Sequence, residues 1–182
     1  PSQLALVDLL GTKKAIAKLS PAKQRRVQKL RCGWLPVNRR VSREDPDRLN
    51  SCSACAPINM AEETVDHIFQ CPCRTRRTAM RAQLAAMYKQ FRSLRTSKLL
   101  LEALFAGARA WIEEQAIPDV SELNLPDSTL GNLVHQAYVE QTSLGWNLLF
   151  RGFWSMSWRQ AQEYEFSQSS LRRGYRDNGE SW

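Results

Sequence analysis

The spacing of three cysteines and one histidine restricts the fold of this chain more than any other feature. Two residues separate Cys52 from Cys55, and eleven residues later His67 precedes Cys71 by four positions. A tight turn with two thiolates, followed by a helical turn with ligands four apart on one face, can surround a tetrahedral ion. Zinc accepts thiolate and imidazole ligands, and four protein ligands leave no open position for a catalytic water. The spacing therefore predicts a structural zinc site.

Cysteine usage also favours metal binding over disulfides. The chain has five cysteines, an odd number, and we expect a reducing compartment, nuclear or cytoplasmic, to keep them as thiols. Cys73 is an alternative to Cys71 as a ligand. The i, i+4 relation to His67 belongs to Cys71, however, and Pro72 redirects the chain before Cys73. The competing interpretation is a set of ordinary free thiols beside a surface histidine.

Positive charge is concentrated in the first part of the chain. Residues 13–43 contain eleven Lys or Arg and no acid, and residues 72–101 contain eight and again no acid. Residues 102–182 have six basic and eleven acidic residues, a net charge of −5. Because the whole chain carries +8, residues 1–101 carry a net charge of +13. A basic region around a metal site favours a polyanionic partner, most simply RNA or DNA.

Some of these basic residues are candidates for phosphate contacts, which would give binding that depends on salt and little on sequence. The candidates are Arg25, Arg26, Lys29, Arg39, Arg40, Arg74, Arg76, Arg77 and Arg81. Two other interpretations stay open. The charges could lie on solvated helix faces, or the basic surface could meet an acidic protein or membrane lipid.

Apolar periodicity predicts helices through most of the chain. Ser20-Pro21 and Cys32-Gly33 are start and stop signals for a helix over 21–32, and residues 62–71 have helical character. Further helices are expected over 77–95, 97–117 and 129–166, the last bent or divided at Gly145. The apolar face of the first of these is Met80, Leu84, Met87, Phe91 and Leu94, and that of the second is Leu100, Leu101, Leu104, Ala108, Trp111 and Ile112.

These patterns predict a mainly α fold in two parts. Residues 1–74 are expected to form a basic helix and a small zinc-stapled module, and residues 75–182 a helical bundle whose last residues, 172–182, are a mobile tail. The aromatic stretch 146–166 is expected to pack in the core rather than stack on bases. Because no run of 18 apolar residues occurs, no membrane span is expected.

The zinc motif and its flanks resemble a known family. The sequence Gly33-Trp-Leu-Pro-Val-Asn38, the Cys52-Ser-Ala-Cys55 pair and Glu62-Glu-Thr-Val-Asp-His67-Ile-Phe-Gln-Cys71-Pro72 are similar to the zinc-binding region that follows the polymerase domain in retrotransposon reverse transcriptases. The segment 141–152 resembles the C-terminal part of such proteins more loosely. Ser53 and Ala54 depart from the family, in which a proline is frequent between the cysteines, but the ligands are unaffected.

The resemblance implies an accessory region of a retroelement polyprotein that binds template RNA or target DNA. No Tyr-x-Asp-Asp sequence of a polymerase is present, and the residues suggest no nucleophile, base and electrophile, so we expect no enzyme activity. A protein-interaction or assembly subunit, in which zinc is purely structural, is the alternative. The sequence begins with Pro1 rather than Met, so a fragment of a larger protein is an open possibility.

Overall fold

A computed structural model of the chain describes residues 3–45, 47, 49–55 and 60–177, and this part is mainly helical, as the sequence predicts. Within these ranges no β-sheet is present. Among the described residues, extended pairing is limited to two isolated antiparallel bridges, Val7 with Ser155 and Ser51 with Glu62. Over the same ranges, no helix combines the length and the apolar character that crossing a bilayer requires.

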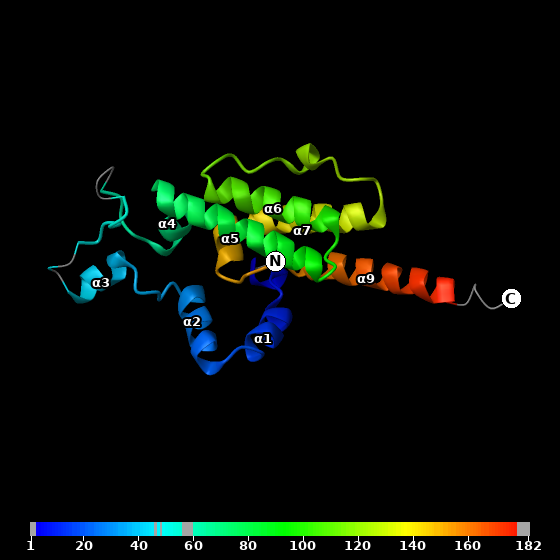
Figure 1. Ribbon diagram of the computed structural model, residues 1–182, viewed down its shortest axis with the longest axis horizontal. Helices are drawn as coiled ribbons and strands as arrows, with labels where there is room; N and C mark the ends of the chain where they lie inside the picture. The colour runs from blue at the N-terminus through cyan, green and yellow to red at the C-terminus, as the bar shows by residue number, and fades with distance from the viewer. Residues whose placement is uncertain (1–2, 46, 48, 56–59, 178–182) are drawn as a thin grey trace.

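The helices follow one another along the chain in the order given next. They are η1 (Gln3–Leu6), α1 (Leu9–Ala17), α2 (Pro21–Arg31), α3 (Asn38–Glu44), α4 (Val65–Gln70), α5 (Arg74–Ser93), α6 (Lys98–Ile112), η2 (Val120–Leu123), α7 (Thr129–Leu144), α8 (Trp146–Phe150) and α9 (Met156–Asp177). Helices α5 to α9 form a bundle, α1 and α2 lie along one side of it, and α3 lies at the end remote from the last turns of α9 (Figure 1).

Local signals account for several helix ends. Helix α2 begins at Pro21, as predicted, and ends at Arg31, one residue before the predicted end. Gly33 follows with φ of +67°, a conformation that glycine adopts without strain. Helix α6 ends at Ile112 rather than near 117, because the chain turns there and Glu114 takes a φ of +54°. Gly145, with φ of +103°, divides the region predicted as 129–166.

Two helices were not expected, and the predicted tail is shorter than expected. Helices α1 and α3 lie in segments whose sequence shows no clear periodicity, and α3 has only seven residues. The backbone of α9 continues to Asp177, so the predicted mobile tail from Arg172 is helical over its first residues. Residues 178–182 of that tail lie outside the described part of the chain.

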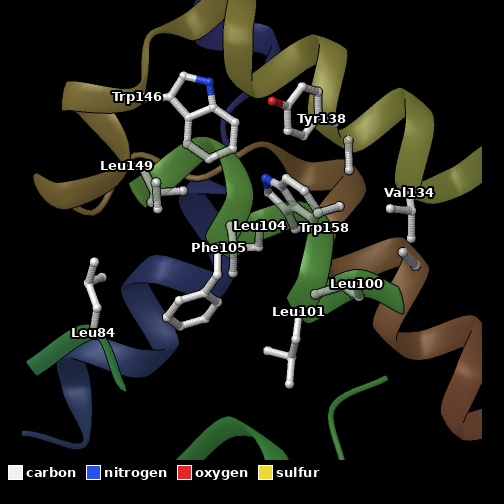
Figure 2. Close-up of a cluster of buried hydrophobic side chains, with 14 of the residues drawn as sticks. Leu84, Leu100, Leu101, Leu104, Phe105, Val134, Tyr138, Trp146, Leu149 and Trp158 are labelled. Atoms are coloured by element: carbon white, nitrogen blue, oxygen red, sulfur yellow. The ribbon is translucent and has the colours of Figure 1, made fainter. Parts of the chain in front are cut away.

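The core is built around α6, which α5, α7, α8 and α9 surround (Figure 2). Leu101, Val134 and Tyr138 are at most 2% exposed, and burial of each such side chain contributes about 1.5–3 kcal/mol. The cluster comprises Leu84, Leu100, Leu101, Ala103, Leu104, Phe105, Ala108, Ile112, Val134, Ala137, Tyr138, Trp146, Leu149, Trp158 and Ala161. Trp146 and Trp158 in this cluster confirm that the aromatic stretch packs in the core, although Phe166 is 41% exposed.

The predicted apolar face of α5 is partly wrong. Leu84 is buried, and Met80 and Phe91 pack against the core. Met87 and Leu94, however, are 36% and 60% exposed, and Tyr88 packs on Phe105 instead, with ring centroids 5.3 Å apart. Helix α5 is thus rotated so that one edge of the predicted stripe meets α6 and the other faces solvent.

Residues near the beginning of the chain pack against the start of α9. The backbone N–H of Asp8 donates to the carbonyl of Trp154 at 2.9 Å, next to the bridge between Val7 and Ser155. The Asp8 carboxylate accepts from the backbone of Gly11, which caps α1, and lies 3.1 Å from Nε of Arg159. These contacts join segments that are far apart in sequence.

Buried Gln141 holds the connection between α8 and α9. This side chain is 0% exposed, and its Oε1 accepts from the backbone N–H of Ser155 at 3.0 Å. Its Nε2 donates to the carbonyls of Gly145 and Phe153, each at 3.3 Å. The neighbouring Glu140 carboxylate accepts from the hydroxyl groups of Ser155 and Ser157. A buried amide with all these partners stabilises the loop, since unpaired it would cost free energy.

Candidate metal centre

The short helix α4 positions two of the predicted ligands. The Thr64 hydroxyl accepts a 3.0 Å hydrogen bond from the backbone N–H of His67, which caps the helix. Helical spacing then directs His67 and Cys71, four residues apart, to the same side. The helix ends at Gln70, Cys71 is its C-cap, and Pro72 follows in the sequence.

A tight turn positions the other two predicted ligands, Cys52 and Cys55. The backbone N–H of Cys55 donates to the carbonyl of Cys52 at 3.0 Å, so both thiols leave the turn toward the same space. The bridge between Ser51 and Glu62, and a 2.8 Å hydrogen bond from the N–H of Cys52 to the carbonyl of Ala61, close this segment next to α4. Residues 56–59 between them lie outside the described part.

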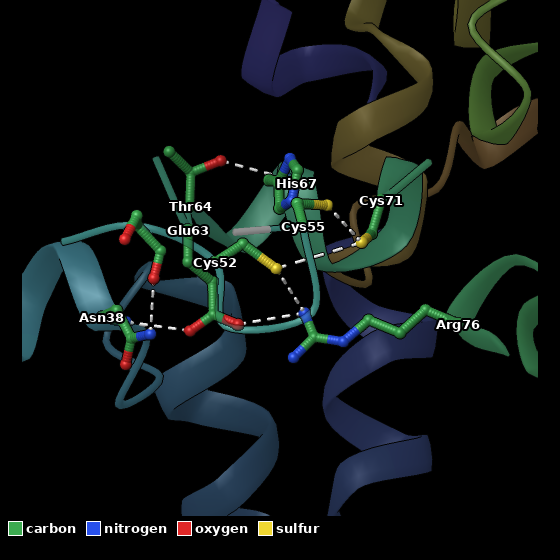
Figure 3. Close-up of polar contacts among 9 residues, drawn as sticks. Asn38, Cys52, Cys55, Glu63, Thr64, His67, Cys71 and Arg76 are labelled. Carbon is green, nitrogen blue, oxygen red and sulfur yellow. Dashed lines mark hydrogen bonds and ion pairs between the residues drawn. The ribbon is translucent and has the colours of Figure 1, made fainter. Parts of the chain in front are cut away.

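The four side chains converge (Figure 3). Sγ of Cys71 lies 3.1 Å from Sγ of Cys55 and 3.9 Å from Sγ of Cys52, and Nε2 of His67 lies 3.5 Å from Sγ of Cys55. All four ligand atoms lie within 4.8 Å of one another. With Zn–S bonds of about 2.3 Å, the edge of a tetrahedral site is about 3.8 Å, so these separations fit one shared ion. Cys73, the alternative ligand, does not belong to this group.

Burial of the cysteines favours a metal site over a set of ordinary free thiols. Cys52 and Cys55 are 0% exposed and Cys71 is 2% exposed. This burial, together with the thiols of Cys71 and Cys52, raises the pKa of Cys55 to about 12. A bound cation reverses that effect, because a coordinating thiol is deprotonated outright. The donor set and its setting therefore fit a metal ion, and the residues that would hold it are the four predicted from spacing.

A charged network that the sequence did not reveal surrounds the thiols. An Arg76 nitrogen donates to Sγ of Cys52 at 3.3 Å and to Oε1 of Glu63 at 3.0 Å (Figure 3). Glu63 is 8% exposed, and its other oxygen accepts from the backbone N–H of Asn38 at 3.1 Å. Burial opposes the charge of Arg76, but the hydrogen bond to Glu63 and the charges of Cys52, Glu63 and Cys71 raise its pKa.

Contacts from α4 attach the cluster to the bundle. The Phe69 ring lies 5.1 Å from that of Phe150 and 6.1 Å from that of Trp111, centroid to centroid. Nε2 of Gln70 donates to the carbonyl of Trp111 at 2.9 Å. Asp66 and Arg151 form a 2.7 Å ion pair. The metal region thus packs on the predicted bundle. The division of the chain at residue 74 into two units stays a prediction.

The predicted phosphate contacts of the first basic block lie on two helices. Arg25, Arg26 and Lys29 are exposed on α2. Arg39 and Arg40 on α3 form ion pairs of 3.3 Å with Glu62 and 3.4 Å with Glu44, respectively.

The predicted phosphate contacts of the second basic block, residues 72–101, lie on α5. Arg74 is exposed and Arg77 is half-buried. Arg81 donates through two nitrogens to Glu113, each at 3.0 Å, and Arg76 belongs to the thiol network. Their role toward nucleic acid stays a prediction.

Comparisons with protein-family models, with curated proteins and with solved structures find no match for this chain. The buried group of three cysteines and one histidine could hold a metal ion and suggests a zinc-binding site, and it identifies no family.

Proposed function

We propose that the chain is a non-catalytic zinc-binding helical module that binds RNA or DNA through its basic N-terminal half. The observation that carries the proposal is the convergence of Cys52, Cys55, His67 and Cys71 within 4.8 Å in a buried setting. Zinc is the ion that best suits three thiolates and an imidazole in tetrahedral geometry. The zinc would fix the segment that connects the basic helices α2, α3 and α5.

The charge distribution supports nucleic acid as the partner. Arg25, Arg26 and Lys29 project from a helix with no acidic residue and no buried side chain. Such a surface contributes nothing evident to the core, and clustered Lys and Arg are the electrostatic signature of phosphate binding.

The resemblance to the zinc-binding region of retrotransposon reverse transcriptases supports the finer proposal that the module derives from such a protein. It includes all four ligands and the Gly33-Trp34-Leu35-Pro36 turn. Glu63, which lies in the motif between Glu62 and Thr64, binds Arg76 and Asn38 beside the ligands, so its place in the motif has a structural reason.

A salt titration of RNA and duplex DNA binding tests the proposal. The affinity should fall steeply as salt rises, because phosphate contacts release counterions. Replacing Arg25, Arg26 and Lys29 together by Gln should weaken binding to all sequences alike and reduce the logarithmic salt slope by about one per removed contact. Zinc content should not change. Arg109→Gln, an exposed position on α6 in the acidic half, is the control and should have little effect.

A protein-assembly role is the second candidate. Leu9 and Leu10 on α1 are 51% and 55% exposed, and exposed neighbouring leucines favour contact with another protein. Absence of nucleic acid binding by the zinc-loaded parent chain at low salt would favour this candidate over the first.

A further inference from the structure

A groove of about 550 Å³ lies between the turn after α2, helix α3 and the start of α4. Its walls carry four arginines, and among the described residues that line it the only acid is Glu44. The arginines are Arg39, Arg40, Arg43 and Arg151, and Trp34 lies among them. Positive charge and an aromatic ring in one concave surface are the two components of single-strand binding sites.

The backbone holds Trp34 in place. Its N–H donates to the carbonyl of Lys29 at 2.6 Å, and the N–H of Gly33 donates to the carbonyl of Leu30 at 3.1 Å. With Gly33 in the left-handed conformation, this pattern is the Schellman motif that ends many helices. Arg40 adds a 2.8 Å hydrogen bond from its guanidinium to the Trp34 carbonyl. The ring therefore projects from a fixed turn.

The Trp34 ring is available for stacking. Apolar residues at this position of a Schellman motif frequently contact the preceding helix, yet Trp34 is 60% exposed. The Arg40 guanidinium lies 4.7 Å from the ring centroid, a cation–π contact that occupies one face. A base placed on the open face would complete a stack of base, indole and guanidinium. Exposure on this scale gives up most of the stabilisation that a buried tryptophan contributes.

The arginines of the groove are available to bind a phosphate. Arg43 is exposed, and no side-chain partner for it is found in the part of the chain that the structure describes. The ion-pair partners of Arg39 and Arg40 are Glu62 and Glu44, whose side chains are 40% and 69% exposed. Such exposed pairs are weak, so exchange of a carboxylate for a phosphate costs little.

We infer that this groove binds a single-stranded segment of nucleic acid, with one unpaired base stacked on Trp34 and the adjoining phosphates on Arg39, Arg40 and Arg43. The inference rests on the proposed nucleic-acid function and specifies both the site and the kind of strand. A duplex base is already stacked between its neighbours and cannot reach the indole face, whereas an unpaired base can. Stacking accepts every base, so little sequence preference is expected.

The test compares oligouridylate and oligothymidylate single strands of about 12 nucleotides, within the span of known single-strand sites, with a duplex of equal length. Binding is followed by fluorescence anisotropy with the full, zinc-loaded chain. Trp34→Ala should weaken single-strand binding by about 5- to 150-fold, the range for loss of one base stack, and duplex binding by less than twofold. Trp34→Phe should retain most of the affinity. Phe166→Ala, at an exposed aromatic on α9, is the matched control and should bind as the parent does.

A second variant tests the phosphate contacts. Arg43→Gln should lower the logarithmic salt slope for single strands by about 0.7 without altering the zinc content. If Trp34→Ala binds single strands as tightly as the parent, while the variant lacking Arg25, Arg26 and Lys29 loses binding, the groove inference is overturned and the proposed function stands. If the parent binds neither single strands nor duplex, both fail.

Discussion

A guanidinium nitrogen of Arg76 lies 3.3 Å from Sγ of Cys52 and 3.0 Å from Oε1 of Glu63, so a single arginine joins a candidate metal ligand to a buried carboxylate. Arg76 comes from the first turn of α5, and Glu63 precedes α4. A positive charge beside a thiolate offsets the negative charge that three deprotonated cysteines would bring. The contact also fixes the direction of the Cys52 side chain.

Arg76→Gln should therefore weaken metal binding. Partners that orient metal ligands typically change the affinity 10- to 100-fold when removed. Arg74→Gln, an exposed arginine two residues away, should leave the affinity unchanged. Competition with a chromophoric zinc chelator measures both. Equal affinity in the two variants would show that the Arg76 contact has no influence on the metal.

The purified chain should contain about one zinc ion, with three sulfur ligands and one nitrogen ligand. Cys52→Ser and His67→Ala should release it, whereas Cys73→Ser should retain it because Cys73 does not belong to the converging group. Elemental analysis gives the stoichiometry, and substitution with cobalt reports the ligand set through its visible absorption. A folded, metal-free sample prepared without chelator would contradict this prediction, as would loss of zinc from the Cys73 variant alone.

The convergence of the four candidate ligands could be predicted from the sequence because the geometry of each pair is local. A two-residue gap makes a turn, and a gap of four places side chains on one helix face. The network around the ligands could not be predicted in this way. Arg76 and Glu63 are thirteen residues apart, and their meeting depends on how α4 packs against α5.

For α5, too, the sequence predicts the local feature but not the one that depends on packing. The repeat of apolar residues correctly indicated a helix and its buried side in broad terms, since Met80, Leu84 and Phe91 contact the core. It could not show the rotation of the helix about its axis. That rotation depends on the Phe105 ring of α6, which packs on Tyr88 and leaves Met87 exposed.

Leu101→Ala and Leu94→Ala provide a matched pair of core and surface substitutions. Leu101 is 0% exposed on α6, and its truncation should lower the free energy of unfolding by about 2–5 kcal/mol. Leu94 is 60% exposed, and the same change there should cost less than about 0.5 kcal/mol. Urea titration followed by circular dichroism measures both. Similar costs at the two positions would contradict the packing of α5 and α6 described above.

Gly107→Ala should destabilise the protein even though alanine favours helices. A Cβ at this position on α6 would lie 2.1 Å from Cζ2 of Trp146, far inside van der Waals contact, and the ring is held in the core. Overpacking of this kind typically costs about 1–3 kcal/mol, more than the gain of about 1 kcal/mol in helix propensity. Thermal unfolding should show a lower midpoint. A higher midpoint would mean that α6 and Trp146 do not approach so closely.

The Glu140 carboxylate should contribute a pH-dependent part of the stability. Burial opposes its ionisation, but hydrogen bonds from Ser155, Gln136 and Ser157 lower its pKa overall. A lowered pKa means that the folded state favours the carboxylate, so this stabilisation is complete above the ordinary glutamate value of about 4.3 and is lost as the pH falls below it.

Glu140→Gln should thus cost more stability at pH 7 than at pH 3. The difference in unfolding free energy between parent and variant is measured at the two pH values, which cancels any loss of metal that both proteins share. Double replacement of Ser155 and Ser157 by Ala should reduce the pH dependence in the same way. A difference that does not change with pH would contradict the role assigned to Glu140.

The pairing of Val7 and Asp8 with Trp154, Ser155 and Arg159 affects the order in which the chain can fold during translation. These partners are roughly 150 residues apart, so at about 5–20 residues per second the first segment waits on the order of 10 s for the second to be synthesised. Helices α4 to α7 can assemble in that interval, because their contacts are closer in sequence. Docking of α1 would then be a late step. Until it occurs, the polycationic α2 is not packed against the bundle and is accessible to ribosomal RNA and to chaperones.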